Sequence, residues 1–145
     1  MPNKAAGKTR KPTPKSPAEF APQVFVGGWD DALKFDGAKF CVLDAEPDDM
    51  PPATHIPIYN ESADRADPKN LDRLVEGMRD AHAKGKPVLV FCGHGMYRSP
   101  LGAAWYLHRT EGLTLEQAYA KLQAVRPKAK PAAGWVGNYA ELQRA

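Results

Sequence analysis

The sequence is poor in cysteine and has no long apolar run. Its two cysteines, Cys41 and Cys92, lie far apart among 145 residues. Without further Cys or His residues at close spacing, we expect neither a disulfide framework nor a metal site, and no cofactor. No apolar run approaches the ~20 residues that cross a bilayer, and the N-terminus lacks the apolar stretch of a secretion signal. We therefore expect a single cytoplasmic domain without a membrane span.

Acidic residues are missing from the first 18 positions. This segment carries five basic residues, whereas the rest of the chain carries 15 basic and 17 acidic ones, so the net charge of +3 originates here. Rich in proline and almost without apolar side chains, it cannot bury enough surface to offset its ordering entropy. We predict a disordered basic tail over residues 1–20 and a folded domain over residues 21–145. A few lysines give only non-specific affinity for nucleic acid, which we do not expect as a partner.

Apolar runs and helical periodicity alternate through the middle of the chain. The runs expected to form strands are residues 23–27, 39–45, 54–58 and 87–91. The segments expected to form helices are residues 71–81, 99–109, 115–125 and 135–142. Polar residues 60–68 are expected to form a loop, and Thr114 with Gln117 forms a capping-box pattern. The alternation predicts an α/β fold with parallel pairing, in which the continuous apolar run 87–91 is buried on both faces.

The stretch from Phe91 to Pro100 carries the chemical signal. It reads Phe-Cys-Gly-His-Gly-Met-Tyr-Arg-Ser-Pro and joins the buried strand to a helix through a tight turn. Backbone N–H groups converge at such a junction and the helix N-terminus adds partial positive charge, which predicts a site for a tetrahedral oxyanion. The residues expected to bind that anion are Gly93, His94, Gly95, Met96, Tyr97 and Arg98.

Three side chains of this loop are candidates for catalysis. Helix N-termini and neighbouring cations favour the ionised form of a thiol, so we expect Cys92 to be a thiolate near neutral pH. A thiolate that faces a bound phosphoryl group is a nucleophile. Arg98 offers a planar fork to two anion oxygens, and Ser99 could donate its hydroxyl to the sulfur as the sulfur leaves. The alternative, a buried apolar Cys92 and a surface Arg98, leaves the paired glycines unexplained.

This loop resembles that of the protein tyrosine phosphatase superfamily, and its dual-specificity branch most closely. Three other segments are similar to that branch, namely residues 24–28, 55–58 and 125–127, so the resemblance covers about residues 22–142. It implies a central, mostly parallel sheet flanked by helices, with residues 21–145 as the catalytic domain. It also implies hydrolysis of phosphotyrosine, and of phosphoserine or phosphothreonine, in a phosphorylated protein or peptide. The reaction would pass through a phosphocysteine without a metal, and we expect a monomer.

Two residues depart from the family pattern. Phe91 stands where the family usually has His, which removes a polar residue that helps to order the loop. Asn60 stands where the family places the aspartate that protonates the leaving oxygen, and an amide cannot act as an acid. Asp64 is our first choice as a substitute, with Glu61 and Asp67 in the same loop. Loss of a general acid typically costs ~10²–10⁴ in rate.

Other interpretations stay open at this point. Asn60 is compatible with a catalytically weak module that binds phosphorylated partners without turnover. Relatives of the loop also act on phosphoinositides and RNA 5′-phosphates, although the absence of lysine from residues 93–97 disfavours a highly charged inositol phosphate. An arsenate reductase or a sulfurtransferase is disfavoured by the position of Cys92 and by the five residues before Arg98. Cys41 is expected to be a core residue and, alternatively, a disulfide partner of Cys92.

Overall fold

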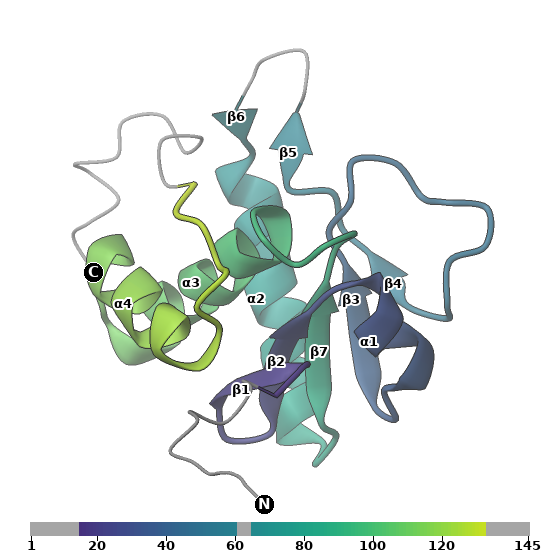
Figure 1. Cartoon of the computed structure of the whole chain (residues 1–145), viewed down its shortest axis with the longest axis horizontal. Helices are drawn as coiled ribbons and strands as arrows, with labels where there is room; N and C mark the ends of the chain where they lie inside the picture. Colours follow the sequence, from purple (N-terminus) through teal and green to yellow (C-terminus); the bar gives the residue numbers. More distant parts are fainter. Residues whose placement is uncertain (1–14, 61–64, 133–145) are drawn as a thin grey trace, which may run out of the picture.

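The central sheet is mixed but mostly parallel (Figure 1). The structure is a computed structural model that describes residues 15–60 and 65–132. The strand order is β1-β2-β7-β3-β4, with β1 antiparallel to β2 and all other neighbours parallel. The strands are β1 (Ala18–Ala21), β2 (Val24–Gly27), β3 (Ala38–Cys41), β4 (Thr54–His55) and β7 (Val88–Phe91). This arrangement confirms the fold class expected from the sequence.

Helices cover both faces of the sheet (Figure 1). In the described part of the chain they are α1 (Trp29–Lys34), α2 (Pro68–Ala83), α3 (Arg98–Glu111) and α4 (Leu115–Val125). Strand β7 alternates between the two layers. Val88 and Val90 join the larger core cluster with α2, α3 and α4, whereas Leu89 and Phe91 join a smaller cluster beneath α1. All four β7 residues are buried, as predicted for a strand covered on both faces.

Two helices begin where the sequence supplies a cap. The hydroxyl of Thr114 accepts the N–H of Gln117 at 3.1 Å and the Gln117 side chain accepts the N–H of Thr114 at 2.9 Å, which confirms the capping box before α4. Helix α2 begins at Pro68, and the Asp67 carboxylate accepts the N–H of Lys69 at 2.9 Å. Such a cap is worth about 1 kcal/mol. Asp67 is therefore engaged in capping α2.

Helix α3 begins one residue earlier than predicted, at Arg98, so Pro100 is its third residue. Proline is tolerated there because the first turn of a helix has N–H groups without intrahelical acceptors. The helix ends at Glu111 and is capped by Gly112, whose φ of 70° lies in the left-handed region that glycine adopts readily. Arg98 is thus held by a rigid helix and not by the preceding turn.

The boundary of the basic tail is corrected by β1. We expected residues 1–20 to be disordered, but Ala18–Ala21 pair with β2, and Ala18 and Phe20 are 3% and 4% exposed. Phe20 contacts the ring of Tyr106 edge-on at 5.9 Å between centroids. Pairing satisfies the backbone of β1 and buries alternate side chains, so these residues order despite the low apolar content of the segment around them.

Two further regions differ from the prediction, and one predicted helix lies outside the described residues. Residues 60–68 are not purely a loop, because β5 (Tyr59–Asn60) and β6 (Arg65–Ala66) pair antiparallel. Helix α1 was not predicted, since its six residues are too few to show a helical period. The helix expected over residues 135–142 lies outside the described residues. None of the described helices is long and apolar enough to cross a membrane.

Candidate active site

The segment from Cys92 to Arg98 connects the carboxyl end of β7 to α3 (Figure 1). Strand β7 lies between β2 and β3 in the sheet, so this loop emerges at the centre of the edge where the parallel strands end. Ligands of open α/β sheets bind in the crevice outside the carboxyl ends of such strands. The fold therefore presents the loop where a small ligand can reach it.

The backbone of the loop is fixed with its carbonyls turned outward. The carbonyls of residues 93–96 all accept hydrogen bonds from outside the loop, at 2.8 to 3.4 Å. The donors are the amides of Trp29 and Lys130 and the guanidinium of Arg126. A trans peptide points its N–H away from its C=O. The N–H groups of residues 94–97 are consequently directed to the inside of the loop, where they can receive an oxyanion.

Cys92 is buried, with 5% of the residue exposed. The N–H of Gly95 donates to Sγ at 3.3 Å, and the thiol donates to the hydroxyl of Ser99, also at 3.3 Å. That hydroxyl in turn donates to the carbonyl of Gly27 at 2.9 Å. The sulfur thus has two polar neighbours that can stabilise a negative charge on it, one backbone amide and one hydroxyl.

The two loop glycines are not equivalent. Gly95 has a φ of 70°, and a Cβ there would approach the carbonyl oxygen of Gly27 to 2.9 Å and overlap the Arg126 guanidinium. A Cβ at Gly93 would meet no atom within 4 Å. Of the two loop glycines, the packing of the loop requires Gly95 and leaves room for a side chain at Gly93.

Arg98 is paired with a carboxylate that the sequence did not indicate. Its Nε and Nη2 donate to the two Asp44 oxygens at 2.9 and 3.1 Å, and its guanidinium lies 5.1 Å from the centroid of the Tyr59 ring. The hydrogen bond to Asp44 raises the pKa of Arg98 above its ordinary value, so this side chain is a permanent cation. Asp44 follows β3, and its contact with Arg98 spans 54 positions, which no local pattern reveals.

Arg126 holds the loop from a buried position. It is 4% exposed, and its Nε donates to the carbonyl of Gly95 at 2.9 Å while its Nη2 donates to that of His94 at 3.4 Å. Burial lowers the pKa of this guanidinium, and the charge of Asp31 opposes that shift. The sequence marked residues 125–127 only as similar to a family segment. The structure gives Arg126 a specific task, which is to bind loop carbonyls.

Phe91 and Cys41 pack away from the loop. The Phe91 side chain is fully buried beneath α1 and meets the Trp29 ring edge-on at 6.2 Å between centroids. Cys41 lies opposite Phe91 in the parallel register, is fully buried in the same cluster, and has a pKa raised by burial. Cys92 instead joins the larger core cluster, which packs against α2, α3 and α4. Both thiols are free, and Cys41 fits the core role that we expected for it.

The residues considered for general acid catalysis are only partly described. Asp64 and Glu61 lie outside the described residues. Asn60 forms the end of β5, where it pairs with Arg65. Among the described carboxylates, Asp44 lies against the loop through Arg98, whereas Asp67 caps α2.

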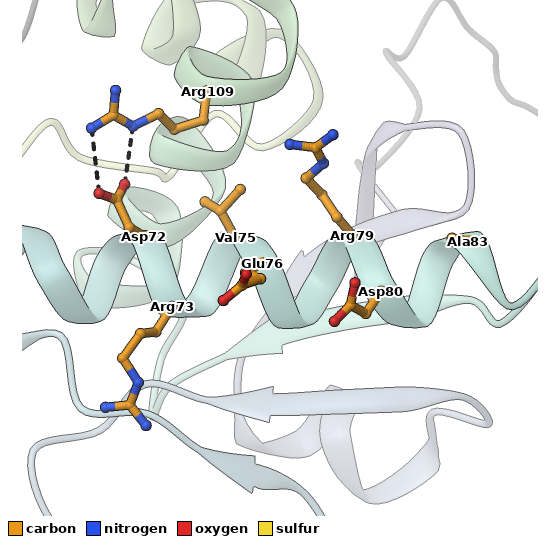
Figure 2. Close-up of a pocket in the computed structure, with 8 residues that line it drawn as sticks. All are labelled: Asp72, Arg73, Val75, Glu76, Arg79, Asp80, Ala83 and Arg109. Atoms are coloured by element: carbon orange, nitrogen blue, oxygen red, sulfur yellow. Dashed lines mark hydrogen bonds and ion pairs between the residues drawn. The ribbon is translucent and has the colours of Figure 1, made fainter.

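A groove of about 650 Å³ runs along α2 (Figure 2), and none of its lining residues belongs to the loop. It is lined by Asp72, Arg73, Val75, Glu76, Arg79, Asp80, Ala83 and Arg109. Arg109 is 11 residues beyond Arg98 on α3, which at 1.5 Å per residue places it roughly 16 Å away along the helix. The Arg109 guanidinium and the Trp105 indole N–H both donate to Asp72, so this wall of the groove is closed by its own contacts.

Comparison with known proteins agrees with the geometry of the loop. The family described as dual specificity phosphatase, catalytic domain, matches residues 45–145. The chain belongs to the dual specificity phosphatase family. The match confirms the resemblance inferred from the loop and assigns this domain to the phosphatase type of catalytic domain.

Individual relatives support the same assignment. Human dual specificity phosphatase 28 is 27% identical over 143 residues, which cover 92% of this chain and 79% of that protein. Human dual specificity protein phosphatase 12 is 43% identical over 61 residues, so the match covers 42% of this chain and less than a fifth of that relative. A crystal structure of a variant of human DUSP28 superposes with a TM-score of 0.68 at 25% identity, covering 81% of this chain and 87% of the other.

Proposed function

We propose that this chain is a cysteine-dependent protein phosphatase that hydrolyses phosphotyrosine, and also phosphoserine or phosphothreonine, through a phosphocysteine intermediate. The observation that carries the proposal is the outward orientation of the loop carbonyls. Carbonyls held outward leave the N–H groups of residues 94–97 on the inner side of the loop, and the N–H of Gly95 already donates to the Cys92 sulfur, next to the N-terminus of α3. Membership of the dual specificity phosphatase family supports the same reaction class.

In the first step the Cys92 thiolate attacks the phosphorus of the bound monoester. The sulfur–phosphorus bond forms as the bond from phosphorus to the leaving oxygen breaks, and that oxygen takes up a proton. The inward N–H groups and Arg98 stabilise charge on the equatorial oxygens in the transition state. The loop is held in advance by Trp29, Lys130 and Arg126, so these donors need little reorganisation when the charge develops.

In the second step water attacks the phosphocysteine and releases phosphate, and Cys92 leaves as a thiolate. Ser99 is suited to assist, because its oxygen is 3.3 Å from Sγ. Its hydroxyl now donates to the Gly27 carbonyl and would rotate to donate to the sulfur as negative charge returns there. We assign the protonation of the leaving oxygen to Asp64, which follows β5 in the chain. Aryl leaving groups need this proton least.

The test is hydrolysis of an aryl phosphate in the presence of a metal chelator. We expect release of phenol and phosphate between pH 5 and 8, and no turnover by a Cys92→Ser variant that still binds phosphate. If the unsubstituted protein binds phosphate but shows no turnover anywhere in this range, the phosphatase assignment is wrong.

A second candidate function is a module that binds phosphorylated partners without turning them over. One observation favours it, namely Asn60 at the position where the family places its general acid. Phosphate binding without turnover, in the experiment above, would select this function. Activity measured side by side on a phosphopeptide, a phosphoinositide and an RNA 5′-phosphate would test the proposed protein substrate.

A further inference from the structure

One two-donor edge of the Arg98 guanidinium is occupied by a carboxylate. Nε and Nη2, the two donors on one edge of the guanidinium, bind the two oxygens of Asp44 at 2.9 and 3.1 Å. A phosphate group is gripped by a guanidinium in the same bidentate way. Asp44 therefore takes the place on Arg98 that two phosphoryl oxygens would take.

The pair is built so that it can open. Both side chains are 30% exposed, so water can replace the lost hydrogen bonds on each side when they separate. An exposed ion pair contributes about 0–1 kcal/mol, and a partly exposed bidentate arginine–carboxylate pair contributes more, so a bound anion must exceed this contact to displace Asp44. A phosphate dianion carries more charge than a carboxylate and also meets the inward N–H groups of residues 94–97, so it is the stronger ligand of the two.

Asp44 is not the only group that positions Arg98. The guanidinium also lies over the Tyr59 ring, 5.1 Å from its centroid, and a cation–π contact of this kind does not depend on a carboxylate. The Arg98 backbone is fixed as the first residue of α3. Removal of the Asp44 charge is consequently expected to leave Arg98 near its present position.

We propose that Asp44 is an internal competitor of phosphate that occupies Arg98 in the empty site and lowers the affinity of the loop for oxyanions. Substrate binding must displace it, and product release is assisted when it returns. This inference rests on the proposed function, because it assumes that the loop binds phosphoryl groups. Asp44 is then a residue that sets the affinity of the loop for phosphate.

The test is calorimetric titration of inorganic phosphate into the full chain carrying Cys92→Ser, with and without Asp44→Asn. We expect Asp44→Asn to tighten phosphate binding about tenfold, because it removes a like charge from beside the bound anion. Asp44→Glu keeps the charge and should bind phosphate about as weakly as the chain with Asp44. Melting temperatures without phosphate, measured for each variant, show whether the fold is retained.

Asp72→Asn is the matched control. Asp72 forms the same bidentate contact with Arg109, at 3.0 and 3.4 Å, in the groove along α2 (Figure 2). Its removal should leave phosphate affinity unchanged. A second readout uses the chain with its native Cys92: Asp44→Asn should lower the KM for an aryl phosphate and the inhibition constant of phosphate by the same factor.

Unchanged or weaker phosphate binding by Asp44→Asn would overturn the inference, since a residue that merely orients Arg98 predicts weaker binding. Tighter binding by Asp44→Glu would overturn it as well, because that variant retains the competing charge. The proposed function fails separately, by the absence of aryl phosphate turnover in the unsubstituted chain. The titration does not depend on turnover, so the two failures are distinguishable.

Discussion

Arg98 and Arg126 both act on the loop between β7 and α3, but in opposite ways. Arg126 is 4% exposed and donates to backbone carbonyls, whereas the Arg98 side chain is 30% exposed and binds the side chain of Asp44. Burial lowers the pKa of Arg126, while the hydrogen bond to Asp44 raises that of Arg98. The difference separates two tasks. One arginine holds the loop permanently, and the other keeps an exchangeable partner that a ligand can replace.

The largest expected effect is that of Arg98→Lys. Lysine keeps the charge but not the planar fork, so kcat/KM for an aryl phosphate should fall about 10²–10³-fold, the usual cost of losing a transition-state donor. The melting temperature should change little, because the side chain is partly exposed. Arg109→Lys, at the other bidentate pair, is the control and should leave kcat/KM unaltered. An equal loss of activity in both variants would contradict the assignment of Arg98 to the ligand.

Arg126→Met should affect stability first and activity second. Methionine fills much of the same buried space but leaves the carbonyls of His94 and Gly95 without their donor. A buried polar group left unsatisfied costs about 1–3 kcal/mol. We expect a free energy of unfolding lower by that amount in urea titrations, and weaker phosphate binding, because the N–H groups of the loop are no longer held inward.

Thermal stability with saturating phosphate distinguishes this from the Arg98 variant. Ligand binding stabilises the folded state by mass action. Phosphate should therefore restore part of the stability lost in Arg126→Met, whereas it should stabilise Arg98→Lys hardly at all. If Arg126→Met lost activity at unchanged stability, Arg126 would belong with Arg98 on the side that contacts the ligand, and the comparison would fail.

The sequence predicted the site residues that are contiguous in the chain and missed those that contact the loop from distant segments. Cys92, Arg98 and Ser99 were predicted as site residues because strand, turn and helix start are contiguous, and their spacing is local information. Asp44 and Trp29 reach the loop only through the neighbouring parallel strands, and Arg126 from beyond α4. Such contacts depend on strand order and register, which a single sequence does not encode in any short pattern.

The same limit explains the errors in the fold. The apolar run ending at Phe91 is long enough to identify β7, and the capping-box pattern at Thr114 predicts the start of α4. Strand β1 has only two buried side chains, Ala18 and Phe20, and is ordered by pairing with β2. Strands β5 and β6 have two residues each, too few to show alternation, so their antiparallel pairing was not visible in the sequence. Elements stabilised mainly by a partner were those that local reasoning missed.

Ser99 is expected both to hold the loop and to assist the reaction, and Ser99→Ala is expected to have the smallest effect. Its hydroxyl donates a hydrogen bond to the Gly27 carbonyl, and its oxygen accepts a hydrogen bond from the Cys92 thiol. Loss of one neutral hydrogen bond costs about 1 kcal/mol of stability. If Ser99 also assists departure of the sulfur, hydrolysis of the phosphocysteine should slow about tenfold while its formation is unchanged, because one hydrogen bond to the leaving sulfur is worth about 1.4 kcal/mol. Rapid mixing with an aryl phosphate would then show a burst of phenol equal to the enzyme concentration, followed by slow turnover. A uniform loss of rate without a burst would place Ser99 with Arg126, among the residues that only hold the loop.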